Sequence, residues 1–170
     1  MNTRQLVYLA MFIAIVFVSV YLSQLPIFSS TGGLVHLGNI ALFSIALKYG
    51  KKYGAISGGI GMALFDLFSG GAWMVWAPGS LVVRFLMGYA VGKVSEDNGN
   101  QGTNFTKNIL AIIAGSIIML VGYYLYEAIF LTTFAASLAS IVGNLTQLGI
   151  GLLALILIKY LPEMDNSAKY

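Results

Sequence analysis

The chain has 170 residues, of which 58% are hydrophobic and 9% are charged, and its mean hydropathy is +0.85. A water-soluble domain of this size does not have such a composition, so most of the chain is expected to lie in lipid. It contains no cysteine and one histidine, which argues against a disulfide framework, a thiolate nucleophile and a metal cage. No cofactor or metal is expected. The basic residues stand at the ends of apolar runs, so the net charge of +3 indicates membrane topology and not nucleic-acid binding.

Six apolar runs are expected to cross the membrane as helices. About 20 helical residues span a hydrocarbon core of roughly 30 Å. No small-residue cleavage site follows the first run, so it is expected to remain as a helix instead of being removed as a signal peptide. The predicted spans are 6–22, 34–48, 53–68, 79–92, 108–130 and 134–158. The fold class is therefore an all-α integral membrane protein, a six-transmembrane-helix bundle in which residues 1–170 form one substrate-binding domain.

The lysines and arginines predict the orientation, because cytoplasmic loops retain positive charge during insertion. With the N-terminus inside, no lysine or arginine falls in an outer loop, and both termini are cytoplasmic. The expected location is the cell (plasma) membrane, with several passes. The basic residues on the cytoplasmic side are Arg4, Lys48, Lys51, Lys52, Lys93, Lys107, Lys159 and Lys169.

The connections on the two sides differ in character. On the outer side, 23–33 and 69–78 combine turn-forming residues with large apolar side chains, which predicts loops that fold back onto the helices as lids. The longest inner connection, 93–107, is polar and is interpreted as a flexible linker between two halves of the bundle.

Polar side chains within the spans predict a binding site. An ionisable group there costs roughly 2.5 to 3.5 kcal/mol by insertion scales, so it usually faces a protein interior or a cavity. Under this topology the polar residues converge on the outer half, and several pairs have the three- or four-residue spacing of one helix face. The inner half is nearly all apolar, which argues against a continuous channel. The candidate substrate-binding residues are His36, Asn39, Asp66, Trp73, Trp76, Arg84, Tyr123, Glu127, Asn144 and Gln147.

The two charged residues and the two tryptophans in this set each have an alternative interpretation. Asp66 and Arg84 either form a buried structural ion pair or contact the ligand. Trp73 and Trp76 either belong to the aromatic belt at the headgroup level or stack on a flat ligand ring.

The remaining polar candidates also have two interpretations each. His36 starts a helix, where a histidine is more often a cap or an interfacial residue than a ligand group. Glu127 is either solvated or a pocket acid that shares a face with Tyr123. Asn144 and Gln147 either bridge helices or bind the substrate.

Several short motifs occur along the chain in the same order as in a known family of proteins. The matching pieces are His36-Leu-Gly38, Tyr49-Gly50, Tyr53-Gly54-Ala55, Gly59-Ile-Gly61, Asp66-Leu-Phe-Ser-Gly70, Trp76-Ala-Pro78 and Gly88 to Gly92. Together they resemble the substrate-binding S components of energy-coupling factor (ECF) vitamin transporters, near the riboflavin and hydroxymethylpyrimidine type. Ala10-Met-Phe-Ile-Ala14 is similar to the alanine motif on the first helix of that family.

The resemblance implies a six-helix bundle that captures a vitamin from outside and is closed by its outer loops. It implies three partner subunits: a transmembrane coupling protein (EcfT-like) that docks on the face of Ala10 and Ala14, and two cytoplasmic ATPases. The chain itself is then no enzyme, and it is expected to topple in the membrane to release its cargo. From the residues alone, the two alanines equally fit packing within the bundle.

The aromatic, amide, acid and phenol groups suit a flat heteroaromatic ring with hydroxyl or amine substituents. Hydroxymethylpyrimidine is the favoured substrate and pyridoxine is the next. In this hypothesis Tyr123 and either Trp73 or Trp76 stack on the ring. The groups that bond its polar edge are Glu127, Asn144 and Gln147.

Three other classes of protein are alternatives to this interpretation. A self-contained proton-driven transporter would use Asp66, His36 and Glu127 as a relay, but no inverted repeat is found. An intramembrane enzyme lacks an HExxH helix, a cysteine and a serine motif. A ligand-free scaffold would use the buried polar groups only to join helices, and their clustering on one side argues against it.

Overall fold

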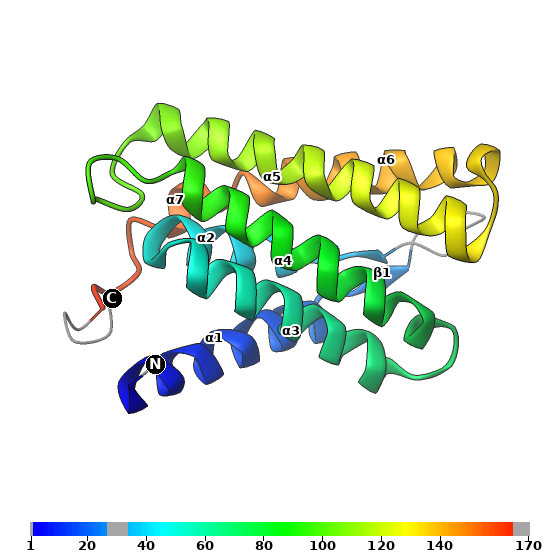
Figure 1. Cartoon of the computed structure of the whole chain (residues 1–170), viewed down its shortest axis with the longest axis horizontal. Coiled ribbons are helices and arrows are strands. Elements are labelled where there is room, and N and C mark those ends of the chain that lie inside the picture. Colours follow the sequence, from blue (N-terminus) through cyan, green and yellow to red (C-terminus); the bar gives the residue numbers. More distant parts are fainter. Residues whose placement is uncertain (1, 27–33, 165–170) are drawn as a thin grey trace.

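The computed structural model describes residues 2–26 and 34–164, so the masked part of the first outer loop, 27–33, lies outside the described residues. Helices make up nearly all of the regular structure (Figure 1). The α-helices are α1 (Thr3–Tyr21), α2 (Gly38–Tyr49), α3 (Lys51–Ser69), α4 (Ala77–Val94), α5 (Phe105–Tyr126), α6 (Phe134–Gly151) and α7 (Ala154–Leu157). A 3₁₀ helix, Gly71–Trp76, precedes α4, and a π-helical turn, Glu127–Leu131, follows α5.

Each predicted span contains a helix, although the helix bounds differ from the predicted bounds. Leu34–Val35 is not helical: it forms strand β2, which pairs antiparallel with β1 (Leu25–Pro26). The second outer connection, predicted as a loop that folds back onto the helices, is mostly a 3₁₀ helix. The sixth run breaks into α6 and α7 after Gly151, a residue type that weakens a helix.

Within the described residues, four helical segments are long and apolar enough to cross a membrane by length and composition. Helix α2 has 12 residues, which at 1.5 Å per residue extend for about 18 Å, short of a full span. Most residues of α2 are buried, as expected of a helix that is apolar around its whole circumference. It is therefore the central helix of the bundle. The four long segments are Thr3–Tyr21, Gly71–Val94, Phe105–Leu131 and Phe134–Leu157.

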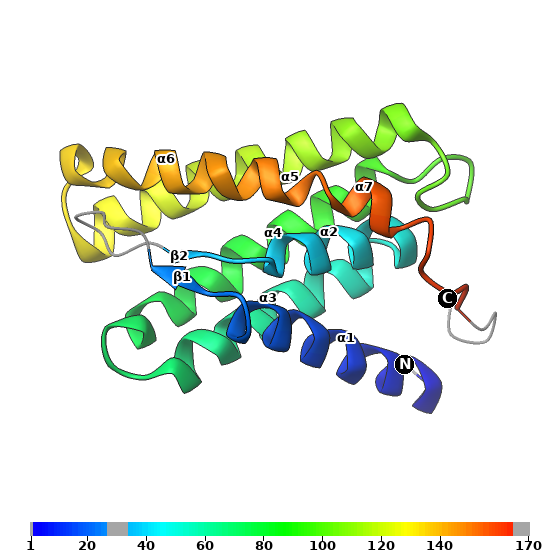
Figure 2. The same ribbon diagram turned by 180° about the vertical axis from the view of Figure 1, so that it is seen from behind.

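The bundle has both described chain ends and the loop between α4 and α5 on one side (Figure 1). Helix α3 packs on α1 and α4, and α5 packs on α4 and α6, while α2 contacts helices of both groups. The β1–β2 hairpin lies between α1 and α6 on the opposite face of the molecule (Figure 2).

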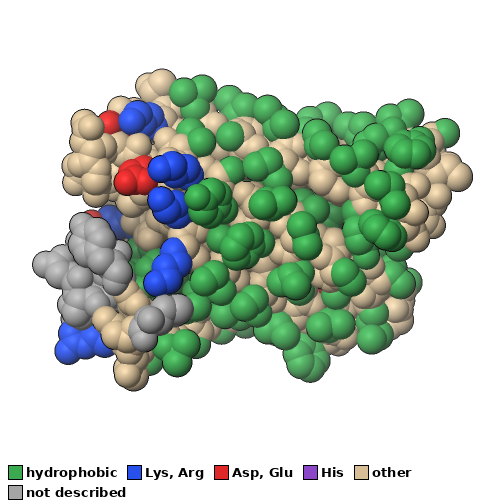
Figure 3. Space-filling model, viewed as in Figure 1, with side chains coloured by type: hydrophobic (Ala, Val, Ile, Leu, Met, Phe, Trp, Pro, Cys, Tyr) green, Lys and Arg blue, Asp and Glu red, His purple; other side chains and the backbone are tan. Residues whose placement is uncertain are grey.

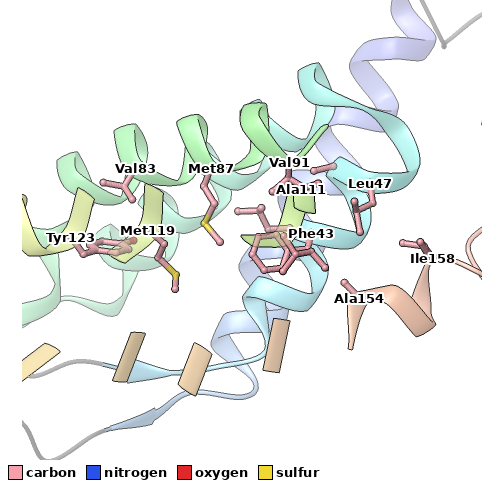
Figure 4. Close-up of a cluster of buried hydrophobic side chains, with 13 residues drawn as sticks. Phe43, Leu47, Val83, Met87, Val91, Ala111, Met119, Tyr123, Ala154 and Ile158 are labelled. Atoms are coloured by element: carbon pink, nitrogen blue, oxygen red, sulfur yellow. The ribbon is translucent and has the colours of Figure 1, made fainter. Parts of the chain in front are cut away.

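One apolar cluster runs along the bundle from Tyr123 to Ile158 (Figure 4). Phe43 and Met87 are fully buried in it and join α2 to α4. A second cluster joins α1, α2 and α3 through residues such as Val16 and Phe65. The polar groups described below lie at the Tyr123 end of the first cluster.

Two glycines of α4 let this helix approach α3 closely. A Cβ atom at Gly88 would lie 2.2 Å from the carbonyl oxygen of Gly54, and one at Gly92 would lie 2.2 Å from the backbone nitrogen of Lys51. Both distances are far below van der Waals contact. Helices without side chains at their contact can pack backbone to backbone, which is the usual device in membranes.

Lysines and arginines gather at one end of the molecule, beyond the apolar surface of the helices (Figure 3). The inner connection that was predicted as a flexible linker is instead partly ordered by hydrogen bonds. Asp97 and Asn100 exchange backbone hydrogen bonds of 2.9 and 2.8 Å, and the Asp97 carboxylate accepts from Asn104 at 2.9 Å and from Lys107 at 3.0 Å. The hydrogen bond from Asn104, followed by the one from Lys107, lowers the pKa of Asp97 below its ordinary value.

Candidate functional site

Arg84 of α4 is the centre of a buried polar network and is 3% exposed. Its Nε donates to the hydroxyl of Tyr123 on α5 at 2.9 Å, and its Nη1 donates to Oδ1 of Asn39 on α2. The guanidinium carbon also lies 5.2 Å from the centre of the Tyr123 ring, within the range of a cation–π contact. One side chain thus joins three helices.

Ser80 belongs to the same network, although the sequence analysis did not select it. Its hydroxyl lies 2.9 Å from the Tyr123 hydroxyl, which can donate to Ser80 while it accepts from Arg84. Ser80 precedes Arg84 by four residues on α4, so the shared helix face was a signal available in the sequence. We call Asn39, Ser80, Arg84 and Tyr123 the Arg84 network.

Asp66 of α3 lies within hydrogen-bonding reach of Ser80 and within electrostatic reach of Arg84. Among the described residues, however, it makes no direct ion pair with Arg84. Its Oδ2 atom is buried and has no hydrogen-bond partner in the described part of the chain. The structure therefore shows two neighbouring buried groups of opposite charge, without the direct ion pair that was one of the two alternatives.

Asn39 connects the network to α6. Its Nδ2 donates to the backbone carbonyl of Gln147 at 3.3 Å and lies 3.4 Å from the sulfur of Met119. This bond uses the main chain of Gln147, so it does not involve the buried amide side chain of that residue. Asn39 therefore acts here as a bridge between helices.

The inward face of α6 is made of small and polar residues. Its buried residues are Ser137, Ser140, Gln147 and Gly151, and Asn144, on the same side of the helix, is half-buried. The two serines were missed by the sequence analysis, although their three-residue spacing continues the Asn144 and Gln147 pattern. A helix with a polar buried face contributes hydrogen-bonding groups to the interior of the bundle.

Glu127 begins the π-helical turn that follows α5 and is 1% exposed. The wider turn is closed by a bond from the Thr132 backbone nitrogen to the Glu127 carbonyl oxygen, at 2.8 Å. Single π-helical turns often occur at functional sites, because they redirect side chains along a helix. Of the two interpretations of Glu127, solvated or buried as a pocket acid, the structure thus shows that the residue is buried.

The two tryptophans have different surroundings. The Trp76 ring centre lies 6.0 Å from that of Tyr123 and 6.2 Å from that of Tyr126. The hydroxyl of Tyr126 donates to the carbonyl of Val75 at 2.5 Å, which ties the 3₁₀ helix to α5. Trp73 is half-buried, and no ring contact of it is found among the described residues. Trp76 is therefore the tryptophan that adjoins the network.

His36 is buried at the entry to α2, where its Nδ1 accepts from the backbone nitrogen of Gly38 at 3.1 Å. This contact is the helix-start role that was the alternative for this residue.

On α1, Ala10 and Ala14 are exposed and so do not serve as packing residues within the bundle as described. In the described part of the chain, no group of three or more histidine or acidic side chains could hold a metal ion.

The structure brings some of the predicted site residues together. Asn39, Arg84 and Tyr123 are joined by hydrogen bonds, Trp76 touches Tyr123, and Gln147 is joined through its backbone. Asp66 adjoins this group. No direct bond to the network is found, within the described residues, for His36, Trp73 or Asn144.

Comparison with known proteins identifies the family. The family model for the S component of the ECF-type riboflavin transporter matches residues 1–162. The chain belongs to this family. The resemblance predicted from the motifs is thereby confirmed, and the protein is an S component of a multi-pass membrane transporter family. Membership implies association with an ECF transporter module and with a vitamin ligand.

Two curated proteins are similar to this S component. It is 27% identical over 150 residues to HmpT, named a thiamine precursor transporter, of Lactococcus lactis subsp. cremoris, a match that covers 88% of this chain and 82% of HmpT. It is 32% identical over 106 residues to an uncharacterised protein of Pyrococcus woesei. That match covers 62% of this chain and 66% of the Pyrococcus protein, slightly less than two thirds of its length.

Proposed function

We propose that this S component captures a small water-soluble vitamin or vitamin precursor from outside the cell for an ATP-driven ECF transporter. Hydroxymethylpyrimidine is the favoured substrate and pyridoxine the alternative. The similarity to HmpT supports the thiamine-precursor assignment, since it covers most of both chains. In this proposal residues 1–170 form one membrane domain in the plasma membrane, with six spans and with both termini in the cytoplasm.

The observation that supports capture most directly is the Arg84 network with its surroundings. Buried guanidinium, phenol, hydroxyl and amide groups from α2, α4 and α5 are joined by hydrogen bonds in the interior of a largely apolar bundle. Such groups are costly inside a membrane and usually serve a substrate or an ion. Their position beside Trp76, the serine and amide face of α6 and the buried Glu127 fits a flat ring with polar substituents.

The substrate contacts are proposed as follows. Trp76 and Tyr123 provide aromatic surface, with Trp73 as the other candidate for stacking. The polar edge of the ring bonds to Glu127, Asn144 and Gln147. The remaining predicted residues support these contacts or reach the ligand themselves: His36, Asn39, Asp66 and Arg84.

The partner subunits belong to the same proposal. Helix α1 carries no lysine, arginine or acid between Gln5 and Tyr21 and exposes Ala10 and Ala14. Small residues on a lipid-facing helix allow close approach of another helix. We assign this face to the transmembrane coupling subunit, and ATP hydrolysis to two cytoplasmic subunits.

The test is ligand identification followed by titration. Native mass spectrometry of the chain purified from rich medium would detect a retained small molecule by its mass. Hydroxymethylpyrimidine, pyridoxine and riboflavin are then titrated, and binding is followed through the fluorescence of Trp73 and Trp76, the only tryptophans. We expect hydroxymethylpyrimidine to bind tightest.

Variants test the site. Glu127→Gln and Asn144→Ala are each expected to weaken binding about tenfold or more, since a lost hydrogen bond to a polar ligand costs on the order of 1 to 3 kcal/mol. Thr146→Ala, on the exposed side of α6, is the matched control. Unchanged binding in both site variants would refute the assignment, and uptake into liposomes by the purified chain alone would favour the secondary transporter.

A further inference from the structure

A cavity with a volume of about 550 Å³ lies at the lysine-bearing end of the bundle. Ile158 lines it, and Figure 4 shows Ile158 at the opposite end of the apolar cluster from Tyr123. The cavity is thus separate from the Arg84 network. It is bounded by the ends of α2 and α5, by the loop before α5 and by the segment that follows α7.

Among the described residues, the side chains that line this cavity carry one excess positive charge. Lys48 and Lys159 line it together with one acidic residue, Glu163. Lys48 forms an ion pair with Glu163, and their side chains are 17% and 75% exposed. The Glu163 side chain is mostly in solvent, whereas the half-buried Lys48 forms part of the wall.

The floor of the cavity is polar and one of its acceptors is unused. Asn108 lines the cavity and is 2% exposed. Its Nδ2 donates to the carbonyl of Gly102 at 2.9 Å, while its Oδ1 is buried without a hydrogen-bond partner in the described part of the chain. A ligand that carries a hydroxyl group could supply the missing donor.

The other wall is apolar. Phe105, Leu155 and Ile158 contribute to the lining. At this end the apolar surface of the helices gives way to lysines and arginines (Figure 3), as happens at the headgroup level of a bilayer. A ligand of this cavity therefore meets cations, amide groups and hydrocarbon side by side.

We propose that this cavity binds the headgroup of an acidic phospholipid with a hydroxyl-bearing phosphodiester, such as phosphatidylglycerol. The single negative charge of that headgroup matches the excess positive charge of the lining. Basic pockets between membrane helices are known sites for anionic lipid headgroups. The apolar wall receives the first part of the acyl chains, and Lys48 and Lys159 bind the phosphate.

The experiment measures lipid retention by native mass spectrometry on the full chain in detergent, titrated with phosphatidylglycerol or phosphatidylcholine. The double variant Lys48→Ala/Lys159→Ala is compared with Lys52→Ala/Lys93→Ala, which removes the same charge from exposed lysines outside the cavity. We expect the first pair to lose phosphatidylglycerol about tenfold and the control pair to lose much less. Equal losses in the two pairs would overturn the proposal.

Two further experiments test whether the lipid occupies the cavity itself and whether a free phosphate is the occupant instead. Thr103→Trp places a bulky side chain at the lining and leaves every charge in place, so it should also reduce retention even if the lysine variant folds poorly. Normal retention in this variant would overturn the proposal. Soluble glycerol phosphate should not displace the lipid at matched concentration, and displacement would show that a free phosphate is the occupant instead. Equal retention of phosphatidylcholine would contradict recognition of the acidic headgroup.

Discussion

Arg84 contacts Tyr123 in two ways: its Nε donates to the tyrosine hydroxyl at 2.9 Å, and its guanidinium carbon lies 5.2 Å from the ring centre. The hydrogen bond fixes the phenol oxygen between Arg84 and Ser80, which lies 2.9 Å away. The Tyr123 ring is thereby held beside Trp76. A ligand that stacks here would meet an aromatic surface whose position is set before binding.

Removal of the Tyr123 hydroxyl should destabilise the protein. Tyr123→Phe leaves Arg84 Nε without its acceptor in a buried place, and a buried unsatisfied donor costs about 1 to 3 kcal/mol. The measurement is the thermal midpoint in detergent, compared with Tyr124→Phe, whose ring is half-buried and packs on Phe134. Equal midpoints for the two variants would show that the bond contributes nothing.

Arg84 and Tyr123 should also be energetically coupled. Lysine at position 84 keeps the charge but lacks the planar fork that reaches Tyr123 and Asn39 together. In a double-mutant cycle with Arg84→Lys and Tyr123→Phe, we expect a coupling free energy of about 0.5 to 3 kcal/mol. The free energies of unfolding of the unmutated protein, the two single variants and the double variant give this value, and strict additivity would argue against the contact.

The close approach of α3 and α4 predicts a steric effect. Gly88→Ala puts a methyl group against the backbone of Gly54, where the ideal Cβ is 2.2 Å from the carbonyl oxygen. Overpacking of this kind costs about 1 to 3 kcal/mol, and more where a backbone cannot shift. At Gly149 of α6 the added Cβ meets no other atom within 4 Å, so Gly149→Ala should be neutral or stabilising by up to about 1 kcal/mol. Stability or expressed yield that ranks these variants in the reverse order would contradict the packing.

The loop before α5 should respond to acid through Asp97. Its pKa is lowered below the ordinary value of 3.8, chiefly by the hydrogen bond from Asn104 and then by Lys107. Because the folded pKa is the lower one, this contribution to loop order is present above about pH 4 and is lost as the pH falls through the folded pKa. Carboxyl NMR titration should show an upward shift of the Asp97 pKa in Asn104→Ala and none in Asn100→Ala. An unchanged pKa in Asn104→Ala would exclude the bond.

The proposed orientation predicts which residues a membrane-impermeant thiol reagent reaches. The chain has no cysteine, so single substitutions report without background. In intact cells Ala72→Cys, in the connection between α3 and α4, should be labelled, whereas Lys52→Cys and Thr103→Cys should react only after the cells are opened. The opposite pattern would invert the topology.

The length of the apolar runs was sufficient to predict a helix in each run, because a membrane leaves the backbone no alternative but internal hydrogen bonding. The structure has four helical segments long and apolar enough to cross a membrane, within the described residues, and six spans stay a prediction. The ends of the helices were harder to predict. Leu34–Val35 is as apolar as the helix that follows, yet it pairs with Leu25–Pro26 in a hairpin. Strand formation here depends on pairing with a second segment, and the hydropathy of Leu34–Val35 alone does not reveal that pairing.

The candidate site shows the same division. The sequence by itself determined that Asn39, Arg84, Tyr123 and Gln147 face the interior, since the cost of polar groups in lipid leaves them no other direction. Only the tertiary structure decided that Arg84 bonds to Tyr123 and Asn39 instead of pairing directly with Asp66, that Ser80 completes the network, and that Trp76 and not Trp73 adjoins it. The reason is geometric: burial is set by each residue's own transfer free energy, whereas partners are set by the rotation and depth at which separate helices pack.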